Sequence, residues 1–487
     1  MTEDALSGIE DALPADRLLR DRHTREEYRR DSWPRALWWT AEEARTHTPA
    51  AVALPRSAQE TAALLRWCHK RSVPVVPRGG GSGVLGAAVP ATEGAIVLDL
   101  TRLDDKPLTA DGEPELISAG AGIYGDALER SLNARGLSCA HFPASMAVST
   151  LGGWVATDGW GQCSTAHGPF RDRVTAVDCV LPDGQILRSA DPAAWIGSEG
   201  SLGVMTRVTF RAMRDEREHA YAAYEFPDMA AGLRALRAVT EAGLRPAVAR
   251  LYDGLDRRFL GPEKEQVSDA GGEGDRIKSR LLLLRGSLRR LADLPGVRGM
   301  LKPLLVLITE GAAARSQLAR AADIVKHYDA ANLGEKPARS WWRHRYRLNF
   351  EKVENYRKLG CFADTLDVVA PWAKIETVYS DMIRAASAHG LAMAHASHLH
   401  QGGACLYFTL SGAGMSDTGT LRHYAGCWRA MIEACIDAGG RPDHHHGIGL
   451  AKKPWLNDIK SSEWIEDWRE RKARLDPQGI MNPGKWG

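Results

Sequence analysis

Three consecutive histidines form the densest group of chemically reactive side chains in the sequence. His444, His445 and His446 stand in "RPDHHHGIGLAKK", and Tyr407 precedes them in "HASHLHQGGACLYFTLSG". An imidazole titrates near neutral pH and a phenol also transfers protons, so the set favours general acid–base catalysis. On an extended backbone the outer two histidines share a face and the middle one opposes them. All three therefore cannot point toward one ligand.

Two alternatives for these histidines stay open. A metal site is the first, and alternation along a strand would place His398 and His400 on one face, from which either could join as a ligand. No H-x-x-x-H or H-E-x-x-H spacing supports it, and we expect no metal. The second alternative is structural, with the imidazoles hydrogen-bonded inside a domain interface.

A glycine-rich loop forms the second chemical feature. The stretch "RGGGSGVLG" at residues 78–86 contains G-x-G-x-x-G, which in a Rossmann fold opens a helix. Here Pro90 and Gly94 follow, and residues 95–100 read as a strand, so the loop joins strand to strand. Its backbone N–H groups can form a nest for an anion such as a pyrophosphate. An ordinary glycine-rich hairpin is the alternative.

Two further glycine-rich loops favour the anion interpretation. They are "FPASMAVSTLGGWVATDGWGQCSTAHGPFRDRV" at residues 142–174 and "WIGSEGSLGV" at residues 195–204. Small residues let another molecule approach the backbone closely. Three such loops between strands predict an extended dinucleotide that passes several backbone segments.

The predicted elements that position these loops divide the chain into two kinds of region. A polar helical segment is expected over residues 1–50, then a strand at "AVALP" and a helix over "SAQETAALLRWCHKR" with Ser57 and Glu60 as its capping box. The segment "TAVDCVLPDGQIL" predicts two strands around a turn. From residue 216 the strand "AAYEF", a helix ending at Gly243 and the strand "PAVARLYD" predict a second, α+β domain.

Composition excludes several classes of protein. The 487 residues are 44% hydrophobic and 25% charged with a formal charge of +2, which indicates a globular protein of two or three domains and no nucleic-acid partner. The eight cysteines show no CxxC spacing, so reduced thiols are expected. No signal-type N-terminus and no long apolar run is present, and we expect a cytoplasmic protein.

Residues 276–302 combine leucines with several basic residues. Among them are Arg280, Arg285, Arg289, Arg290, Arg298 and Lys302. A solvated basic helix with its leucines in the core is the favoured interpretation. Peripheral contact with an anionic membrane surface is the alternative.

The ordered set of motifs resembles the vanillyl-alcohol-oxidase/PCMH superfamily of FAD enzymes and, within it, the alkyldihydroxyacetonephosphate synthases. The glycine loop, "GSEGSLGV" and "LDPQGIMNPGKWG" carry the broad likeness, and "STLGGWVAT", "RPAVARLYD", "GACLYF" and "HHHGIG" carry the narrower one. The resemblance implies an α+β fold with a PCMH-type FAD-binding domain of two α/β subdomains over residues 51–215. A cap or substrate domain with an antiparallel sheet would follow over residues 216–440. Residues 441–487 would complete the active site and the FAD domain, and residues 1–50 would form an N-terminal extension.

The resemblance also implies FAD as cofactor, bound without a covalent link because Ser82 stands where flavinylated relatives place a histidine. The implied catalytic residues are Tyr407 as acid/base, His444 to His446 as proton-transferring or ketone-binding groups, and Arg250 before the flavin. The implied cofactor-binding residues are Arg78, Gly79, Gly80, Gly81, Ser82, Gly83, Pro143, Ser145, Ser149, Thr150, Gly152, Gly153, Thr157, Glu199, Gly200, Gly203 and Val204.

The activity implied is the replacement of the acyl group of an acyloxy-ketone by a long-chain alcohol through a flavin N5 adduct, which yields an ether lipid. An oxidoreductase acting on an alcohol or 2-hydroxy acid is the alternative, and a flavoprotein without turnover is a third. The Arg-Asp pair with which the synthases grip phosphate is not found, so the head group stays open. Candidate substrate-binding residues are Arg347, Lys352, Arg357, His398 and Lys452. A homodimer is expected.

Overall fold

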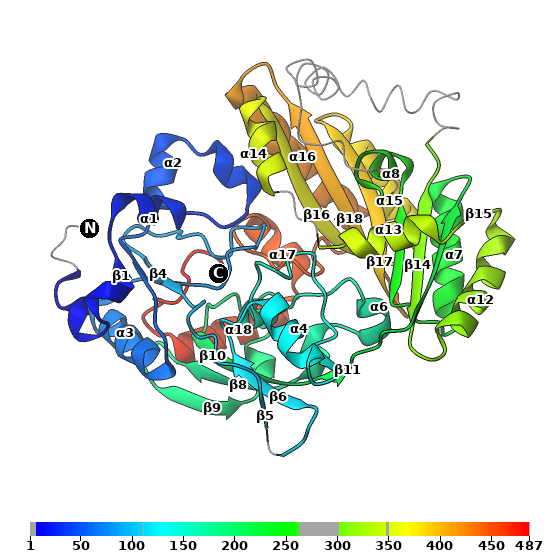
Figure 1. Ribbon diagram of the computed structural model, residues 1–487. Helices are drawn as coiled ribbons and strands as arrows, with labels where there is room; N and C mark the ends of the chain where they lie inside the picture. The colour runs from blue at the N-terminus through cyan, green and yellow to red at the C-terminus, as the bar shows by residue number, and fades with distance from the viewer. Residues whose placement is uncertain (1–5, 111, 263–300, 347–349, 487) are drawn as a thin grey trace. The chain divides into compact units, whose positions relative to one another are not determined.

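The chain folds into two compact units. The computed structural model describes residues 6–110, 112–262, 301–346 and 350–486. Unit 1 comprises residues 1–161, 169–215 and 445–487, and unit 2 comprises residues 162–168 and 216–444. The chain thus enters unit 2 twice and returns to unit 1 for its last segment, so neither unit is continuous in sequence (Figure 1).

The first sheet of unit 1 has the strand order β1-β2-β4-β3. Its strands are β1 (Leu18–Leu19), β2 (Ala51–Ala53), β3 (Val75–Arg78) and β4 (Ile96–Asp99). Strands β2 and β3 both pair with β4 in parallel, and every residue of β2 and β4 is buried, as expected for short apolar runs in a parallel sheet. Because β3 and β4 are parallel, the glycine-rich loop between them is not a hairpin.

The first fifty residues pack onto the first sheet of unit 1. Strand β1 pairs with β2, and Leu6, Ile9 and Leu13 are buried in the same core cluster as α3 (Ala58–Arg71). These apolar side chains bury against the first sheet, so the segment folds as part of unit 1. Its regular helices, α1 (Arg22–Glu27) and α2 (Ala41–Thr46), are short.

Helix α3 begins as predicted, with one difference at its cap. The Ser57 hydroxyl accepts the backbone N–H of Glu60 at 3.1 Å, which is half of a capping box. The Glu60 carboxylate accepts the N–H of Arg56 instead of that of Ser57. The cap therefore extends one residue further back than the motif predicts.

The second sheet of unit 1 is antiparallel, with the order β5-β6-β10-β8-β9. Its strands are β5 (Leu108–Thr109), β6 (Leu116–Gly120), β8 (Val174–Val180), β9 (Ile186–Ala190) and β10 (Val204–Arg211), and β7 (Leu137–Ser138) pairs separately with β11 (Met213–Arg214). The other regular helices of unit 1 are α4 (Gly125–Asn133), α5 (Leu151–Ala156), α17 (Leu456–Ile459) and α18 (Ser462–Leu475). The predicted strand pair around residues 182–184 is confirmed as β8 and β9.

The C-terminal segment is anchored inside unit 1 by buried polar groups. Lys472 Nζ donates to the Asp476 carboxylate at 2.6 Å and to the Ser201 and Met481 carbonyls. Lys485 is fully buried and donates to the Val89 carbonyl at 2.5 Å. These bonds attach the end of the chain to the third glycine-rich loop, at Ser201, and to the segment that follows the first, at Val89.

Unit 2 is built on a seven-stranded antiparallel sheet with the order β15-β12-β14-β13-β17-β18-β16. The strands are β12 (His219–Glu225), β13 (Val248–Tyr252), β14 (Leu304–Glu310), β15 (Ala331–Gly334), β16 (Cys361–Pro371), β17 (Leu391–His400) and β18 (Gly403–Ala413). Strands β17 and β18 form a long hairpin beside β16 (Figure 1). The implied antiparallel sheet of the second domain is confirmed.

Helices cover this sheet and connect its strands. They are α6 (Ser164–His167), α7 (Met229–Glu241), α8 (Gly254–Leu260), α12 (Ala314–Val325), α13 (Lys336–His344), α14 (Phe350–Lys358), α15 (Ile375–Ala386) and α16 (Asp417–Asp437). Helix α7 contacts α12 and α15, and α15 contacts α16, so these four form a continuous layer on the sheet. The predicted helix that ends at Gly243 is confirmed as α7.

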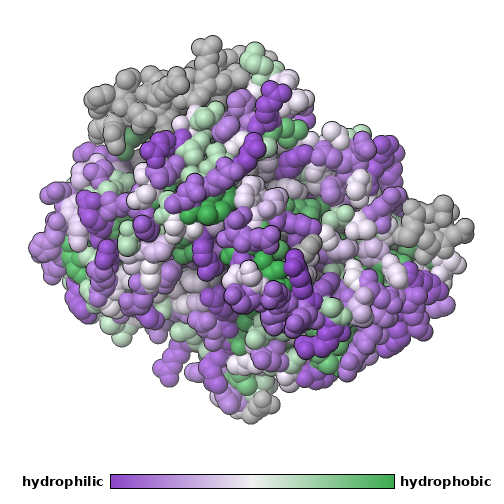
Figure 2. Space-filling view, turned by 180° about the vertical axis from the view of Figure 1, so that it is seen from behind, coloured by the Kyte–Doolittle hydropathy of each residue, from purple (hydrophilic) through white to green (hydrophobic). Residues whose placement is uncertain are grey.

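The surface in Figure 2 is covered mostly by hydrophilic residues, with hydrophobic ones in small separate areas. Among the helices that the structure describes, none combines the length and the apolar composition needed to cross a membrane. The basic segment of residues 276–302 lies outside the described residues except for its last two. Of these, Lys302 forms an ion pair with Glu225 at 3.3 Å.

Candidate active site

Two of the three glycine-rich loops meet inside unit 1. A Cβ atom on Gly79 would collide with the Thr150 hydroxyl, and one on Gly80 would collide with the Val148 carbonyl oxygen. Only glycine permits this approach of two backbones. Thr150 is the N-cap of α5, where its hydroxyl accepts the N–H of Gly153.

The third loop packs against the first two. The N–H groups of Gly197 and Glu199 donate to the carbonyls of Val155 and Ala156, at the end of α5, at 2.9 and 2.8 Å. A Cβ atom on Gly200 would come within 2.9 Å of Pro77 Cγ in β3. The prediction that the three loops serve one site therefore has a geometric basis within unit 1.

Glu199 has a structural contact that the sequence does not reveal. Its carboxylate accepts the N–H of Ile448 at 2.7 Å and that of Gly449 at 3.0 Å, which fixes the turn after the histidines. Burial raises the pKa of Glu199 to about 6, and the two N–H donors oppose that shift. Asn482 donates to the Glu199 carbonyl at 2.6 Å and holds the same residue from the C-terminal side.

The first loop has unused donors that fit a diphosphate. Within the described part of the chain, no group accepts a hydrogen bond from the backbone N–H groups of residues 79–83. These residues are half-buried, whereas the residues of β4 beside them are buried. Free N–H groups on a glycine-rich turn form an anion-binding nest. The loop therefore fits the diphosphate of FAD, and the residues that would hold it are Gly79 to Gly83.

The other predicted cofactor residues divide into two groups. The half-buried ones, which keep surface available for a ligand, are Arg78, Pro143, Ser145, Gly153 and Thr157, and the buried ones, which shape the loops, are Ser149, Thr150, Gly152, Glu199, Gly200, Gly203 and Val204. Arg78 donates to the Arg30 carbonyl at 2.7 Å and lies against Gly81. Ser149 accepts the indole N–H of Trp154 at 2.8 Å. Both side chains therefore have partners within the protein.

In unit 2 the predicted acid/base Tyr407 lies on β18, opposite His395 of β17. The two rings are stacked, with centroids 4.8 Å apart and planes at 17°. Burial raises the pKa of Tyr407 to about 12, partly offset by the Thr365 hydroxyl and the Arg250 charge. The phenol therefore stays protonated at neutral pH and can act as a proton donor.

Arg250 lies on β13 beside the same histidine. Its Nη2 is 3.4 Å from His395 Nδ1, and its guanidinium lies over the rings of Tyr252 and Trp341 at 5.2 and 5.9 Å. Aromatic faces attract a guanidinium and restrict its position. Arg250 and Tyr407, which the sequence separates widely, are thus brought to one histidine.

The histidines of "HASHLH" are arranged differently from the prediction. His398 has a φ of +51°, and the β17–β18 register shifts between Ser397 and His400. This bulge interrupts the alternation, so the expectation that His398 and His400 share a face is wrong. His398 Nδ1 lies 2.7 Å from the Ser164 hydroxyl, and its ring is 5.4 Å from that of His444.

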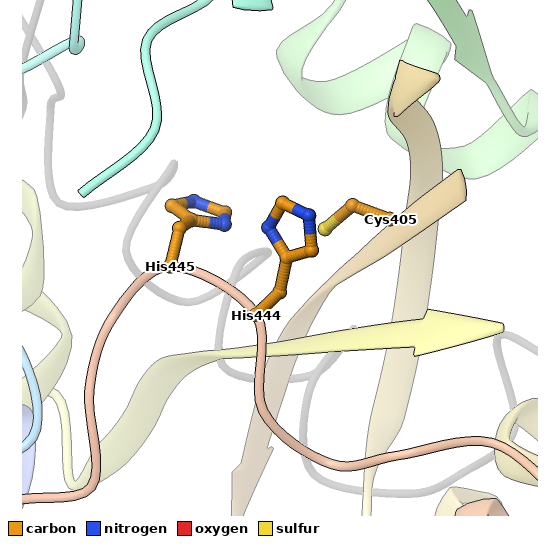
Figure 3. Close-up of side chains that lie close together, drawn as sticks. All are labelled: Cys405, His444 and His445. Atoms are coloured by element: carbon orange, nitrogen blue, oxygen red, sulfur yellow. The ribbon is translucent and has the colours of Figure 1, made fainter. Parts of the chain in front are cut away.

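The three consecutive histidines lie on a bend, so the extended backbone assumed for them is also wrong. The His444 N–H donates to the buried Asp367 carboxylate at 3.1 Å, which fixes the start of the bend. Figure 3 shows the Cys405 side chain of β18 beside His444, with His445 next on the same loop. The His445 and His446 rings contact each other, with their centroids 4.3 Å apart.

The Cys405 thiol and the neighbouring imidazoles are side chains that can bind Zn²⁺. We expect no metal here, and this stays a prediction that metal analysis of the purified protein tests.

The candidate substrate-binding residues have different surroundings where the structure describes them. Arg347 lies outside the described residues, and of Lys352 only the backbone is described, in α14. Arg357 forms an ion pair with Asp417 at 2.9 Å. Lys452 is fully buried in unit 1.

Sequence reasoning missed two carboxylic acids and one histidine of this cluster, Asp253, Asp256 and His395. Asp253 and Asp256 stand at the N-cap and third position of α8, and this Asp-x-x-Asp spacing is a helix-start signal that could have located them. His395 stands in the same stretch as the histidines that were considered. Only the pairing of β13 with β17 places it beside Arg250.

A nest that fits a diphosphate on one unit, and a cluster of proton-transferring groups on the other, are features expected of a FAD-dependent enzyme. Family models agree with this. Residues 49–190 match the FAD binding domain, and residues 215–486 match the C-terminal domain of FAD linked oxidases. The chain belongs to the FAD-linked oxidase family.

Individual relatives carry different names. An alkyldihydroxyacetonephosphate synthase of Dictyostelium discoideum is 27% identical over 463 residues, which cover 90% of this chain and 73% of the relative. A D-lactate dehydrogenase of Archaeoglobus fulgidus is 25% identical and covers 89% of this chain and 90% of its own. A solved structure of an alkyldihydroxyacetonephosphate synthase superposes with a TM-score of 0.78 at 24% identity, and covers 100% of this chain and 86% of that one. This structural similarity, at 24% identity, supports the assignment of the fold.

Proposed function

We propose that the protein replaces the acyl group of an acyloxy-ketone, such as acyl-dihydroxyacetone phosphate, by a long-chain alcohol, and so forms an ether bond. The observation that carries the proposal is the grouping of Tyr407, His395 and Arg250 in unit 2. A protonated phenol and a cation that both contact one histidine suit a reaction in which an alcohol loses a proton and a carboxylate departs. The synthase relatives support the same assignment.

Each of these residues would have its own role in the reaction. The N–H groups of residues 79–83 would bind the diphosphate of FAD, which supplies a ring that can accept and return an electron pair. Tyr407 would exchange a proton with the substrate oxygen, and Arg250 would stabilise negative charge that develops on the ketone. His444, with its backbone fixed by Asp367, would accept the proton of the incoming alcohol.

A second candidate function is oxidation of an alcohol or 2-hydroxy acid. The D-lactate dehydrogenase and a glycolate oxidase subunit of Bacillus subtilis are similar to this chain at 25% identity, close to the values for the synthases. In the described residues no Arg-Asp pair stands in the region where the synthases grip phosphate. Both observations favour a test of hydroxy acids beside acyloxy-ketones.

Product analysis separates the two functions. The purified yellow protein is incubated without oxygen with acyl-dihydroxyacetone phosphate and a long-chain alcohol, and lipids are identified by mass spectrometry. We expect an ether lipid and one free fatty acid for each ether formed, with no electron acceptor required. Absence of ether, together with reduction of a dye by D-lactate or glycolate, would refute the proposal in favour of oxidation.

The proposed mode of FAD attachment gives a further prediction. Ser82 and its glycine neighbours offer no imidazole or thiol for a covalent link to the flavin. Denaturation in acid should therefore release all the flavin into the supernatant, which absorbance of both fractions measures. Yellow colour that stays with the precipitated protein would contradict the non-covalent mode.

A further inference from the structure

We propose that Asp256 and His395 are positioning residues: together they hold the Tyr407 ring and the Arg250 guanidinium, and the proton on Asp256 sets how much of the Arg250 charge acts on a substrate. The inference rests on the proposed function, because Tyr407 and Arg250 are the groups that would meet the substrate. Asp256 and His395 would act through them.

Asp256 is fixed by the way α8 begins. Asp253 caps the helix, and its Oδ1 accepts the N–H of Asp256 at 2.7 Å. Its Oδ2 accepts the N–H of Ala394 in β17 at 2.9 Å and the hydroxyl of Tyr379 in α15 at 3.1 Å. The helix start is thereby attached to the strand that carries His395. This leaves the Asp256 side chain fully buried against that strand.

His395 is held on two sides. Its Nδ1 lies 2.8 Å from Asp256 Oδ2, and its ring stacks on Tyr407. The imidazole is buried, with 4% of its surface exposed, and it also contacts the Tyr252 ring at 5.6 Å. An imidazole restrained in this way restrains the phenol stacked on it.

One nitrogen of His395 has two partners that it cannot satisfy together. Nδ1 lies near both the Asp256 carboxyl and Arg250 Nη2. If Nδ1 carries the proton, it donates to the Asp256 carboxylate and has no lone pair for Arg250. If Asp256 carries the proton, it donates to Nδ1 and the ring holds its own proton on Nε2. The cluster thus has two protonation states with different tautomers of His395.

Burial places the change between these states near neutral pH. Burial raises the pKa of Asp256 to about 7, and Arg250 opposes the shift. Burial, reinforced by the Arg250 charge, holds the pKa of His395 well below its ordinary value, so the ring stays neutral.

The ionisable groups around Asp256 come from three strands, from α15 and from the start of α8 itself. They are Arg250 and Tyr252 of β13, His395 of β17, Tyr407 of β18 behind it, and Asp253 with its partner Tyr379 of α15. Burial and the negative charge of Asp256 also raise the pKa of Asp253. Arg250 is the cation of this set, so the Asp256 charge acts on it most directly.

The sign of the expected pH effect follows from Arg250. Above pH 7 the ionised Asp256 offsets the guanidinium charge, and below pH 7 the neutral acid leaves that charge available. A cation stabilises developing negative charge best when no anion neutralises it. The proposal therefore predicts that kcat/KM falls by up to about tenfold per pH unit above pH 7, as for a single required proton.

Asp256→Asn in the FAD-loaded protein tests this directly. The amide keeps the size of the side chain and removes its ionisation, so kcat/KM should lose the decline centred near pH 7 and vary less than about twofold between pH 6 and 8.5. Glu225→Gln is the matched control, because Glu225 pairs with Arg257, the next residue of α8, and should keep the wild-type profile. A folded, FAD-loaded Asp256→Asn protein with the wild-type pH profile would overturn the proposal.

His395→Phe is the second variant, should Asp256→Asn fold poorly. Phenylalanine keeps the stack on Tyr407 but removes the donor to the Asp256 carboxylate, so the decline in kcat/KM should move to higher pH by at least about half a unit. An unchanged decline would count against the proposal.

A readout without turnover separates this inference from the proposed function. In protein labelled with ¹⁵N-histidine, one neutral imidazole should change tautomer near pH 7. Its signals should be absent in His395→Phe and should not titrate in Asp256→Asn. If the wild-type protein forms no ether, the proposed function is refuted. The pH profiles of wild type and variants are then compared with the hydroxy acid that the protein oxidises. A His395 tautomer that is constant from pH 5 to 9 would refute the positioning role itself.

Discussion

Tyr407→Phe is expected to lower kcat by roughly 10²–10⁴-fold, the range for loss of a well-placed acid or base. The substitution removes only the hydroxyl, so the ring can keep its stack on His395 and its place opposite Asp367 in the β16–β18 ladder. FAD content and KM for the ketone substrate should change little. The measurement is steady-state turnover of the FAD-loaded variant, with flavin content determined by absorbance.

Tyr224→Phe provides the matched control for this prediction. Tyr224 is a buried tyrosine on β12 of the same sheet, away from the Tyr407 strand in the sheet order. It should retain wild-type kcat within about twofold, because a phenol outside the active site transfers no proton to the substrate. Equal kcat in wild type and Tyr407→Phe would remove Tyr407 from the mechanism.

Gly80→Ala is expected to abolish most FAD binding. The added Cβ would collide with the Val148 carbonyl oxygen, and neither backbone can give way without separating the two loops. A shift of the nest displaces several N–H donors at once, so we expect the Kd for FAD to rise at least about tenfold, or about 1.4 kcal/mol. Flavin fluorescence titration of the apoprotein measures it.

Gly83→Ala is the control within the same loop. Its Cβ would meet Asp31 Oδ2 at 3.5 Å, an ordinary contact, and no other described atom lies within 4 Å. FAD affinity should stay within about threefold of wild type. Similar FAD affinities for Gly80→Ala and wild-type protein would contradict the placement of the cofactor on this loop.

The sequence predicts the parts of the fold that local signals determine. The glycine loop between β3 and β4 could be separated from a Rossmann turn because Pro90 and Gly94 prevent a following helix. In the second domain, strands β12 and β13 and helix α7 follow from short strand-like runs and helical periodicity. These features depend on neighbouring residues, which a single sequence contains.

The cluster around His395 could not be predicted because it depends on strand pairing. Residues Arg250, Asp256, His395 and Tyr407 come from β13, α8, β17 and β18, and their contacts exist only in the observed sheet order. The bulge at His398 has no glycine or proline to mark it, so simple alternation gave the wrong face. The packing of the N-terminal segment could not be predicted either, because its few apolar residues are spaced irregularly and become buried against β2 and α3.

The most direct test of the proposed reaction is an anaerobic absorbance titration of the FAD-loaded protein with acyl-dihydroxyacetone phosphate, followed by a long-chain alcohol. We expect the flavin spectrum to change when the ketone is added and to return to that of oxidised flavin when the alcohol is added, since no net electrons are transferred. A spectrum that ignores the ketone, together with lasting bleaching by a 2-hydroxy acid, would contradict it and identify the protein as an oxidoreductase.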